Sequence, residues 1–430
     1  MKSRRVLPVQ SRREFLAASA LWGGVLFLPS RVLGQGGQTP PSRKLNIAAV
    51  GVGGMGASDL GNWGGENVIA LCDVDDRRAA GAFQKHPNAA RFKDYRVMLD
   101  KLGKDLDAVS VYTPDHMHAP IALARRMQDA AHRYKVVTQM GIQMHASEGN
   151  RRVREWVAAG IIGDVRRVDC WTNRPTWPQG MTALPEQQPV PPELDWDLWQ
   201  GGQTNYKYNS AFLPGSWRGW YAFGCGALGD MGTHIFDFVS SALDLGVPAR
   251  ITGEVEHVSP VAFPRASVVT YEFAARGARP PVTLTWRDGN RPPEKPAGFP
   301  EGEKVGDAMI GAFLHGDKGT IWINADYSPR LLPMEQMRER KDELEKAKTL
   351  PRVAGSHYAQ FLRACKGEDQ TEAHFDYAGP LTEVVLAGAI AQRCPGRPLV
   401  YNRKAMKFDG DAEATALIQR SMPAPAGTAA

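Results

Sequence analysis

The sequence predicts an α/β protein with an N-terminal Rossmann dinucleotide-binding domain and a C-terminal α/β domain that holds a large open, mainly antiparallel sheet. A glycine-rich turn joins the first buried strand pattern to a helix pattern, which is typical of the first domain. Strand-like runs then dominate the second half of the chain. With 430 residues, of which 43% are hydrophobic, the chain is long enough to bury both cores. The predicted parts are an N-terminal segment (1–34), a linker (35–44), the dinucleotide-binding domain (45–146) and the second domain (147–430).

The N-terminal segment carries most of the net charge. The whole chain has a formal charge of +6, and residues 1–34 contribute +5 of it, from six basic residues and Glu14. A strongly basic protein would suggest a nucleic-acid partner. Because the remaining chain is close to neutral, we expect no nucleic-acid binding.

The same segment has the order of an export signal. Arg12 and Arg13 precede an apolar run at 17–28, which is too short to span a membrane, and a small-residue end follows at Gly34. The paired arginines mark the twin-arginine type. We therefore expect cleavage near Gly34, a periplasmic or otherwise exported protein, and the twin-arginine export machinery as a partner. An uncleaved amphipathic arm is the alternative.

The glycine-rich turn follows a buried strand pattern at 45–50. Gly51 permits the tight turn, Gly53 lets the backbone approach a pyrophosphate, and Gly56 permits close helix packing. The next helix offers N–H donors to phosphates. A purely structural turn is the alternative. The predicted cofactor-binding residues of this turn are Gly51, Gly53, Gly54, Met55 and Gly56.

Asp73 ends the second strand pattern (67–72), 22 residues after Gly51. An acid at this place binds the ribose hydroxyls of the adenosine. Its carboxylate repels a 2′-phosphate, so the sequence favours NAD as the cofactor. The neighbouring Arg77 and Arg78 keep NADP as the less favoured alternative.

A third strand pattern (107–114) leads into a loop that carries Asp115, His116 and His118. Ligands bind at the carboxyl ends of such strands, so we expect cofactor contacts from Thr113, Pro114 and His118. Two histidines beside an aspartate are also compatible with a metal. Since no further ligand cluster accompanies them, and the five cysteines form no close pairs, we predict no metal site and mostly buried thiols.

The second domain begins with a helix pattern at 149–159 and then turns to strands. Because the strands follow one another with few helices between them, we expect a mainly antiparallel sheet. The predicted strands are 165–171, 250–258, 267–273, 282–286, 308–314 and 319–323, and the later helices are 334–348, 357–366 and 377–393.

These motifs together resemble the Gfo/Idh/MocA oxidoreductase family, from about Asn46 to about Phe408. The resemblance implies an NAD-binding first domain, and a second domain that binds a sugar or glycoside and forms a homo-oligomer. Two further segments, 171–175 and 375–383, are similar to an exported bacterial subgroup. The motifs that carry the family resemblance are 50–56, 70–75, 113–119 and 160–164.

Residues 226–234 are similar to the family's substrate motif. Asp230 and His234 are four residues apart, so they share one face of a helix. Oxidation of a hydroxyl needs a base for its proton, and histidine titrates in the right range. The resemblance implies that His234 is the acid/base and Asp230 its partner; capping and packing are the alternative. His145, Arg174 and Trp177 are predicted to line the substrate site.

The chain departs from the family after the loop at 113–119. Most members carry a Lys-Pro turn on a following strand, whereas here the helix pattern at 119–134 passes directly to 136–141. We therefore expect the first sheet to lose a strand, unless 135–140 takes the vacated place. Glu294-Lys295-Pro296 lies in a proline-rich loop and is not a substitute. The polar residues that could compensate for the missing lysine are Asp115, His118, Gln139, Gln143 and His145.

Three functions remain open. The first is an NAD-dependent oxidoreductase that transfers hydride from a sugar or sugar derivative to tightly bound NAD. The second is a redox-neutral, NAD-dependent glycoside hydrolase. The third is an NAD-binding pseudoenzyme, because the catalytic lysine of the family has no matching position.

Overall fold

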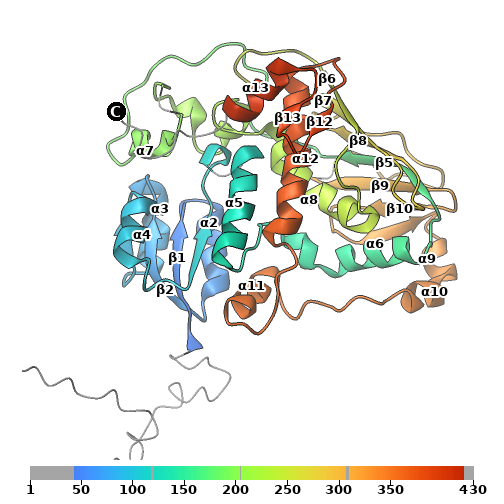
Figure 1. Cartoon of the computed structure of the whole chain (residues 1–430), viewed down its shortest axis with the longest axis horizontal. Coiled ribbons are helices and arrows are strands. Elements are labelled where there is room, and N and C mark those ends of the chain that lie inside the picture. The colour runs from blue at the N-terminus through green and yellow to red at the C-terminus, as the bar shows by residue number, and fades with distance from the viewer. Residues whose placement is uncertain (1–42, 118–120, 204, 307–308, 421–430) are drawn as a thin grey trace, which may run out of the picture.

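The computed structural model describes residues 43–117, 121–203, 205–306 and 309–420 (Figure 1). The predicted export signal, and with it the predicted cleavage position, lies outside these residues. Among the described helices, none combines the length and the apolar character that crossing a membrane requires.

The first domain is an α/β unit built on a parallel sheet of four strands in the order β3-β2-β1-β4. The chain passes outward from β1 to β2 and β3, then returns to β4 on the other side of β1. In such sheets the loops that follow β1 and β4 diverge, and ligands bind between them. The elements are β1 (Asn46–Val50), α2 (Met55–Asp59), η4 (Leu60–Trp63), β2 (Asn67–Cys72), α3 (Asp76–Lys85), β3 (Ala90–Phe92), α4 (Tyr95–Leu102), β4 (Ala108–Val111), η5 (Asp115–Met117), α5 (Ile121–Tyr134) and η6 (Gln143–Ala146).

The sheet of the first domain ends at β4 within the described residues. Residues 136–140 form no strand, so they do not take the vacated place. Val109 and Val111 of β4 are 37% and 54% exposed. The strands of a parallel sheet are usually buried on both faces. Helix α5 lies beside α12 (Phe375–Arg393) of the second domain (Figure 1).

The second domain holds a seven-stranded sheet in the order β11-β10-β9-β5-β8-β7-β6. All of its neighbouring pairs are antiparallel except β5 with β8, which confirms the predicted mainly antiparallel sheet. Its strands are β5 (Val165–Trp171), β6 (Arg250–Val255), β7 (Ser267–Phe273), β8 (Val282–Arg287), β9 (Gly311–Gly316), β10 (Thr320–Ile323) and β11 (Pro329–Leu332).

Helices α6 and α8 pack with α12 against one face of this sheet and form the largest core (Figure 1). The remaining elements are α6 (Glu148–Ala158), α7 (Trp196–Gln200), η7 (Ser210–Phe212), η8 (Ser216–Gly219), α8 (Gly226–Leu243), α9 (Gln336–Glu339), α10 (Lys341–Lys346), α11 (His357–Cys365), α12 (Phe375–Arg393), β12 (Tyr401–Asn402), β13 (Lys407–Phe408) and α13 (Ala412–Arg420).

Helix α11 belongs to the late part of the chain but packs on the first domain. Tyr358, Phe361 and Leu362 contact the core on one face of the parallel sheet. The Trp63 ring centroid lies 5.7 Å from that of Tyr358 and 5.9 Å from that of Phe361. A helix from beyond residue 350 therefore completes the core of the first domain.

Candidate active site

The glycine turn has the geometry that the sequence predicts. Gly51 has a φ of 81°, a conformation that favours glycine, and a Cβ there would lie 2.7 Å from the Tyr112 carbonyl oxygen. A Cβ on Gly56 would lie 2.2 Å from the Gly51 carbonyl oxygen. Both positions therefore require glycine.

Asp73 holds this turn in place. One carboxylate oxygen accepts the Val52 N–H at 2.8 Å and the other accepts the Asp75 N–H at 3.0 Å. Burial raises the pKa of Asp73, while the backbone N–H groups oppose the shift. Since each carboxylate oxygen has two lone pairs, both keep an acceptor position for a ribose hydroxyl. Arg78 donates to the Gly53 carbonyl at 2.8 Å.

The loop after β4 joins the two domains. The His116 ring is buried; one ring nitrogen lies 2.8 Å from the Trp199 carbonyl and the other 3.3 Å from the Phe223 carbonyl. Burial lowers the pKa of His116, so this ring is neutral. Thr113 and Pro114 are half-buried beside it, whereas His118 lies outside the described residues.

Asp230 and His234 lie one turn apart on α8, as predicted. Asp230 accepts a hydrogen bond from the Arg218 Nε at 2.6 Å, so its described hydrogen-bond partner is Arg218 rather than His234. Burial lowers the pKa of His234, while the Asp230 and Asp237 carboxylates oppose the shift. The imidazole is therefore neutral near pH 7 and can accept a proton.

Asp115 has more contacts with the second domain than its place in the sequence predicts. One of its oxygens accepts the N–H of Cys225, which precedes α8, at 3.1 Å. Burial and the nearby Asp230 carboxylate raise the pKa of Asp115 to about 7, against the effect of Arg218. Its position at the end of β4 was the available signal, but its burial and its neighbours come from the second domain. We call Asp115, Arg218, Cys225, Asp230 and His234 the junction cluster.

His145 lies behind α8 and does not line an open site. It is 4% exposed, and its Nδ1 lies 2.6 Å from an oxygen of Asp237. The Tyr377 hydroxyl donates to the same oxygen at 2.6 Å. The structure therefore gives His145 a part in fixing Asp237, which follows His234 by three residues, in place of the predicted contact with substrate.

Arg174 and Trp177 lie near the junction cluster. The Trp177 ring is 5.4 Å from the Arg218 guanidinium carbon and 5.7 Å from that of Arg174. Trp217 lies closer to Arg218, at 4.2 Å. These rings and guanidiniums form a half-buried surface on which a sugar ring can stack.

No metal cluster is found among the described residues: none of their His, Cys, Asp and Glu side chains gather in groups of three or more that could hold an ion. All five cysteines are free thiols, of which Cys72, Cys170 and Cys394 are buried.

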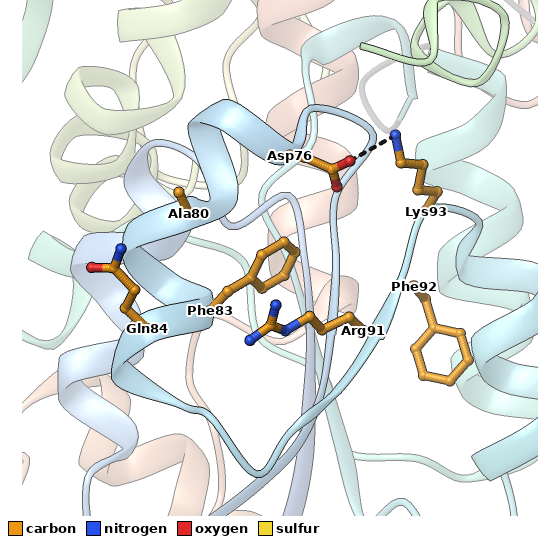
Figure 2. Close-up of a pocket in the computed structure, with 7 residues that line it drawn as sticks. All are labelled: Asp76, Ala80, Phe83, Gln84, Arg91, Phe92 and Lys93. Carbon is orange, nitrogen blue, oxygen red and sulfur yellow. Dashed lines mark ion pairs between the residues drawn. The ribbon is translucent and has the colours of Figure 1, made fainter. Parts of the chain in front are cut away.

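A surface hollow of about 550 Å³ lies at α3 and β3 (Figure 2). Asp76 and Lys93 form an ion pair of 3.0 Å at one end, and Arg91 lies over the Phe83 ring at 4.9 Å. None of the predicted site residues lines it. The hollow is therefore separate from the junction cluster.

Residues 150–278 match the family model for the C-terminal alpha/beta domain of the GFO_IDH_MocA oxidoreductase family. A search among proteins of curated function finds no match for the chain. The matched residues lie in the second domain and include β5 and α8. They also include four residues of the junction cluster: Arg218, Cys225, Asp230 and His234.

Solved structures share the fold across both domains. An oxidoreductase domain protein from Kribbella flavida has a TM-score of 0.53 at 20% identity, over 83% of this chain and 98% of that one. The WlbA dehydrogenase from Chromobacterium violaceum, in complex with NADH and UDP-GlcNAcA, has a TM-score of 0.58 at 14% identity, over 84% and 96%. Levoglucosan dehydrogenase, in complex with NADH and levoglucosan, has a TM-score of 0.52 at 14% identity, over 82% and 97%. At identities this low, the TM-scores show a common fold and no more.

Proposed function

We propose that this protein is an NAD-dependent oxidoreductase that acts on a sugar or sugar derivative. The observation that carries the proposal is the hydrogen bond between Asp115, on the loop after β4, and Cys225, which precedes the α8 helix of His234. This contact brings the loop after β4 of the first domain against the N-terminal end of α8, the helix that carries the neutral His234. The NADH and sugar ligands of the WlbA and levoglucosan dehydrogenase structures support the same function.

The residues of the first domain fit a dinucleotide. The turn from Gly51 to Gly56 would receive the pyrophosphate, because side chains are excluded where the backbone must approach it. Asp73 would bind the ribose hydroxyls and disfavour a 2′-phosphate, so we propose NAD rather than NADP. When bound, the nicotinamide supplies a hydride acceptor.

The residues of the second domain bind the substrate and accept its proton. His234 is neutral and takes the proton from the sugar hydroxyl at a ring nitrogen. Arg218 holds the Asp230 carboxylate one turn away, where it stabilises the protonated imidazole. Trp177 supplies a stacking surface for the sugar ring.

A second function is favoured by the short first sheet. Among the described residues the first sheet ends at β4, which supports the expectation that the family strand with the Lys-Pro turn is missing. We propose as the second candidate a protein that holds NAD without turnover. A sugar panel distinguishes the candidates: growth of the NADH absorbance identifies the oxidoreductase, and aryl-glycoside cleavage without net NADH identifies the redox-neutral hydrolase.

Cofactor binding is tested with a matched pair of glycine variants. Gly56→Ala places a Cβ 2.2 Å from a backbone oxygen, whereas Gly61→Ala places one with no atom within 4 Å. We expect Gly56→Ala to lose at least about tenfold in NAD affinity and Gly61→Ala to keep it, by fluorescence titration. Wild-type protein that is folded but binds no NAD would refute the proposed function.

We also propose that the chain is exported by the twin-arginine route and functions as a homo-oligomer. The proposal rests on the paired arginines and apolar run of the N-terminal segment and on the family resemblance. An intact N-terminus on exported protein, by mass spectrometry, contradicts the predicted cleavage near Gly34. Light scattering of the same sample measures the oligomeric state.

A further inference from the structure

Two guanidiniums lie beside the Trp177 ring, and only one of them has a described counter-charge. The guanidinium carbons of Arg174 and Arg218 lie 5.7 Å and 5.4 Å from the centre of that ring. Arg218 forms an ion pair of 2.6 Å with Asp230. Arg174 has no acidic partner within ion-pair distance among the described residues, and its side-chain contacts go to neutral groups. Arg174 therefore keeps a positive charge that no described acid compensates.

The neutral contacts hold the Arg174 guanidinium by its two terminal nitrogens. One of them donates to the Thr176 hydroxyl, and the other lies 3.3 Å from the Met309 sulfur. Each terminal nitrogen has two N–H groups, so each keeps one for a further acceptor. The Nε atom is buried, whereas the contacts of the terminal nitrogens are exposed. The accessible end of Arg174 is therefore a planar fork of two nitrogens, which is the geometry that binds a carboxylate with two hydrogen bonds.

The backbone of Arg174 and the ring of Trp177 are fixed by hydrogen bonds. The Arg174 N–H donates to the Thr172 hydroxyl at 3.3 Å, and the Arg174 carbonyl accepts the Gly289 N–H at 2.8 Å. The Trp177 Nε1 donates to the side chain of Gln179, a buried residue, at 3.0 Å. A cation that is held in place in advance loses less conformational entropy when a ligand binds.

We propose that Arg174 is a specificity-determining residue that binds a carboxylate of the substrate, so that the substrate class is a sugar acid. This inference rests on the proposed function, because it names the substrate class of the same site. One uncompensated guanidinium matches the single charge of a carboxylate, whereas a phosphate monoester carries about two charges at pH 7. A neutral sugar would leave the guanidinium without a counter-charge.

Arg174 belongs to the surface that leads to the proposed acid/base. It shares the Trp177 ring with Arg218, and Arg218 holds the Asp230 carboxylate one turn from His234. The indole offers an apolar face to the sugar ring. The carboxylate then binds at the Arg174 end of this surface, and the hydroxyl that is oxidised lies at the His234 end.

The substrate class is tested by binding in the presence of NADH, so that no oxidation takes place. Calorimetric titration compares the methyl glycosides of glucuronate, galacturonate and mannuronate with those of glucose, galactose and mannose. We expect at least one acid to bind about tenfold or more tightly than its neutral counterpart. Glucose 6-phosphate should bind more weakly than that acid. If no acid is preferred to its neutral counterpart, or if the phosphate binds more tightly, the inference is wrong.

The role of Arg174 is tested with matched variants. Arg174→Gln should remove the preference for the acid, a loss of about tenfold or more, while its affinity for the neutral glycosides changes much less. Arg174→Lys keeps the charge but loses the fork, so it should keep part of the preference. Arg166→Gln, near the start of β5, changes an arginine whose side chain is 62% exposed and should leave the preference unchanged. If Arg174→Gln keeps the preference, the inference is overturned. If it does not fold, Arg174→Lys decides, and an undiminished preference in that variant has the same meaning.

The results separate the substrate class from the proposed function. NADH formation from neutral sugars, without a preference for acids, refutes the role of Arg174 and leaves the oxidoreductase function in place. Preferential binding of an acid without NADH formation from NAD supports the role of Arg174 and refutes the oxidoreductase function.

Discussion

Two of the contacts between the domains each hold a carboxyl group, and the partners of the two groups differ. At the α5–α12 contact, Glu383 is fully buried and accepts hydrogen bonds from Arg125, Arg403 and the Tyr401 hydroxyl. In the junction cluster, Asp115 has one backbone N–H and a second carboxyl group nearby. The charge of Glu383 is compensated by two guanidiniums, whereas burial and the Asp230 carboxylate raise the pKa of Asp115 to about 7.

The largest expected effect belongs to the junction cluster. His234→Gln removes the proton acceptor, so we expect kcat to fall by about a thousandfold while NAD affinity and the urea midpoint stay unchanged. His257→Gln, on an exposed loop, is the control. A His234→Gln protein that keeps its turnover would show that His234 is a packing residue.

The next effect belongs to the α5–α12 contact. Glu383→Gln leaves two guanidiniums without their counter-charge, so we expect the free energy of unfolding to fall by about 3 kcal/mol. The urea midpoint measures it. Glu413→Gln, whose carboxylate pairs with Arg397 and is 69% exposed, should cost less than about 1 kcal/mol. Equal losses in the two variants would remove the contrast between a buried and a surface ion pair.

The next effect in size is expected for Asp73, whose described hydrogen-bond partners are backbone N–H groups. Asp73→Asn loses the charge that these donors and the ribose hydroxyls recognise, so we expect NAD binding to weaken about tenfold. The preference for NAD over NADP should shrink as well. Titration with both cofactors measures this, and an unchanged preference would remove Asp73 from the cofactor site.

The smallest change in the free energy of unfolding is expected for a substitution on β4, the edge strand of the first sheet. Val111 is 54% exposed, so Val111→Thr should change the free energy of unfolding by less than about 0.5 kcal/mol. Val50, on the neighbouring strand, is 7% exposed, and Val50→Thr should cost about 1–3 kcal/mol because it buries a hydroxyl. A large loss from Val111→Thr would mean that a partner covers this edge in solution.

Local patterns predicted most of the fold. The strands at 67–72, 165–171 and 267–273 have the bounds that the sequence indicates, because continuous or alternating apolar runs specify them. The strand pattern at 308–314 is shifted, since β9 covers Gly311–Gly316, and the helix pattern at 334–348 divides into α9 and α10. Short elements were missed: β3 has three residues and the exposed pattern of an edge, and β11 is four residues long beside a proline.

The site was predicted less completely because its chemistry depends on contacts between distant segments. The glycine turn is a local motif and was found. The partner of Asp230 was not found, since Arg218 lies twelve residues earlier in η8, a short helix that no sequence pattern predicted. The burial of His145 depends on Asp237 and Tyr377, from two different helices. The raised pKa of Asp115 likewise depends on α8 of the other domain.

Helix α11 has a consequence for the order in which the chain matures. The first domain begins at β1, yet Tyr358, Phe361, Leu362 and Cys365 belong to its core. At about 5–20 residues per second, the ribosome needs on the order of tens of seconds to pass from β4 to α11. During that interval Trp63 lacks its aromatic neighbours, so the dinucleotide-binding turn reaches its final packing only after most of the chain has been synthesised. Cofactor binding would then follow the synthesis of α11.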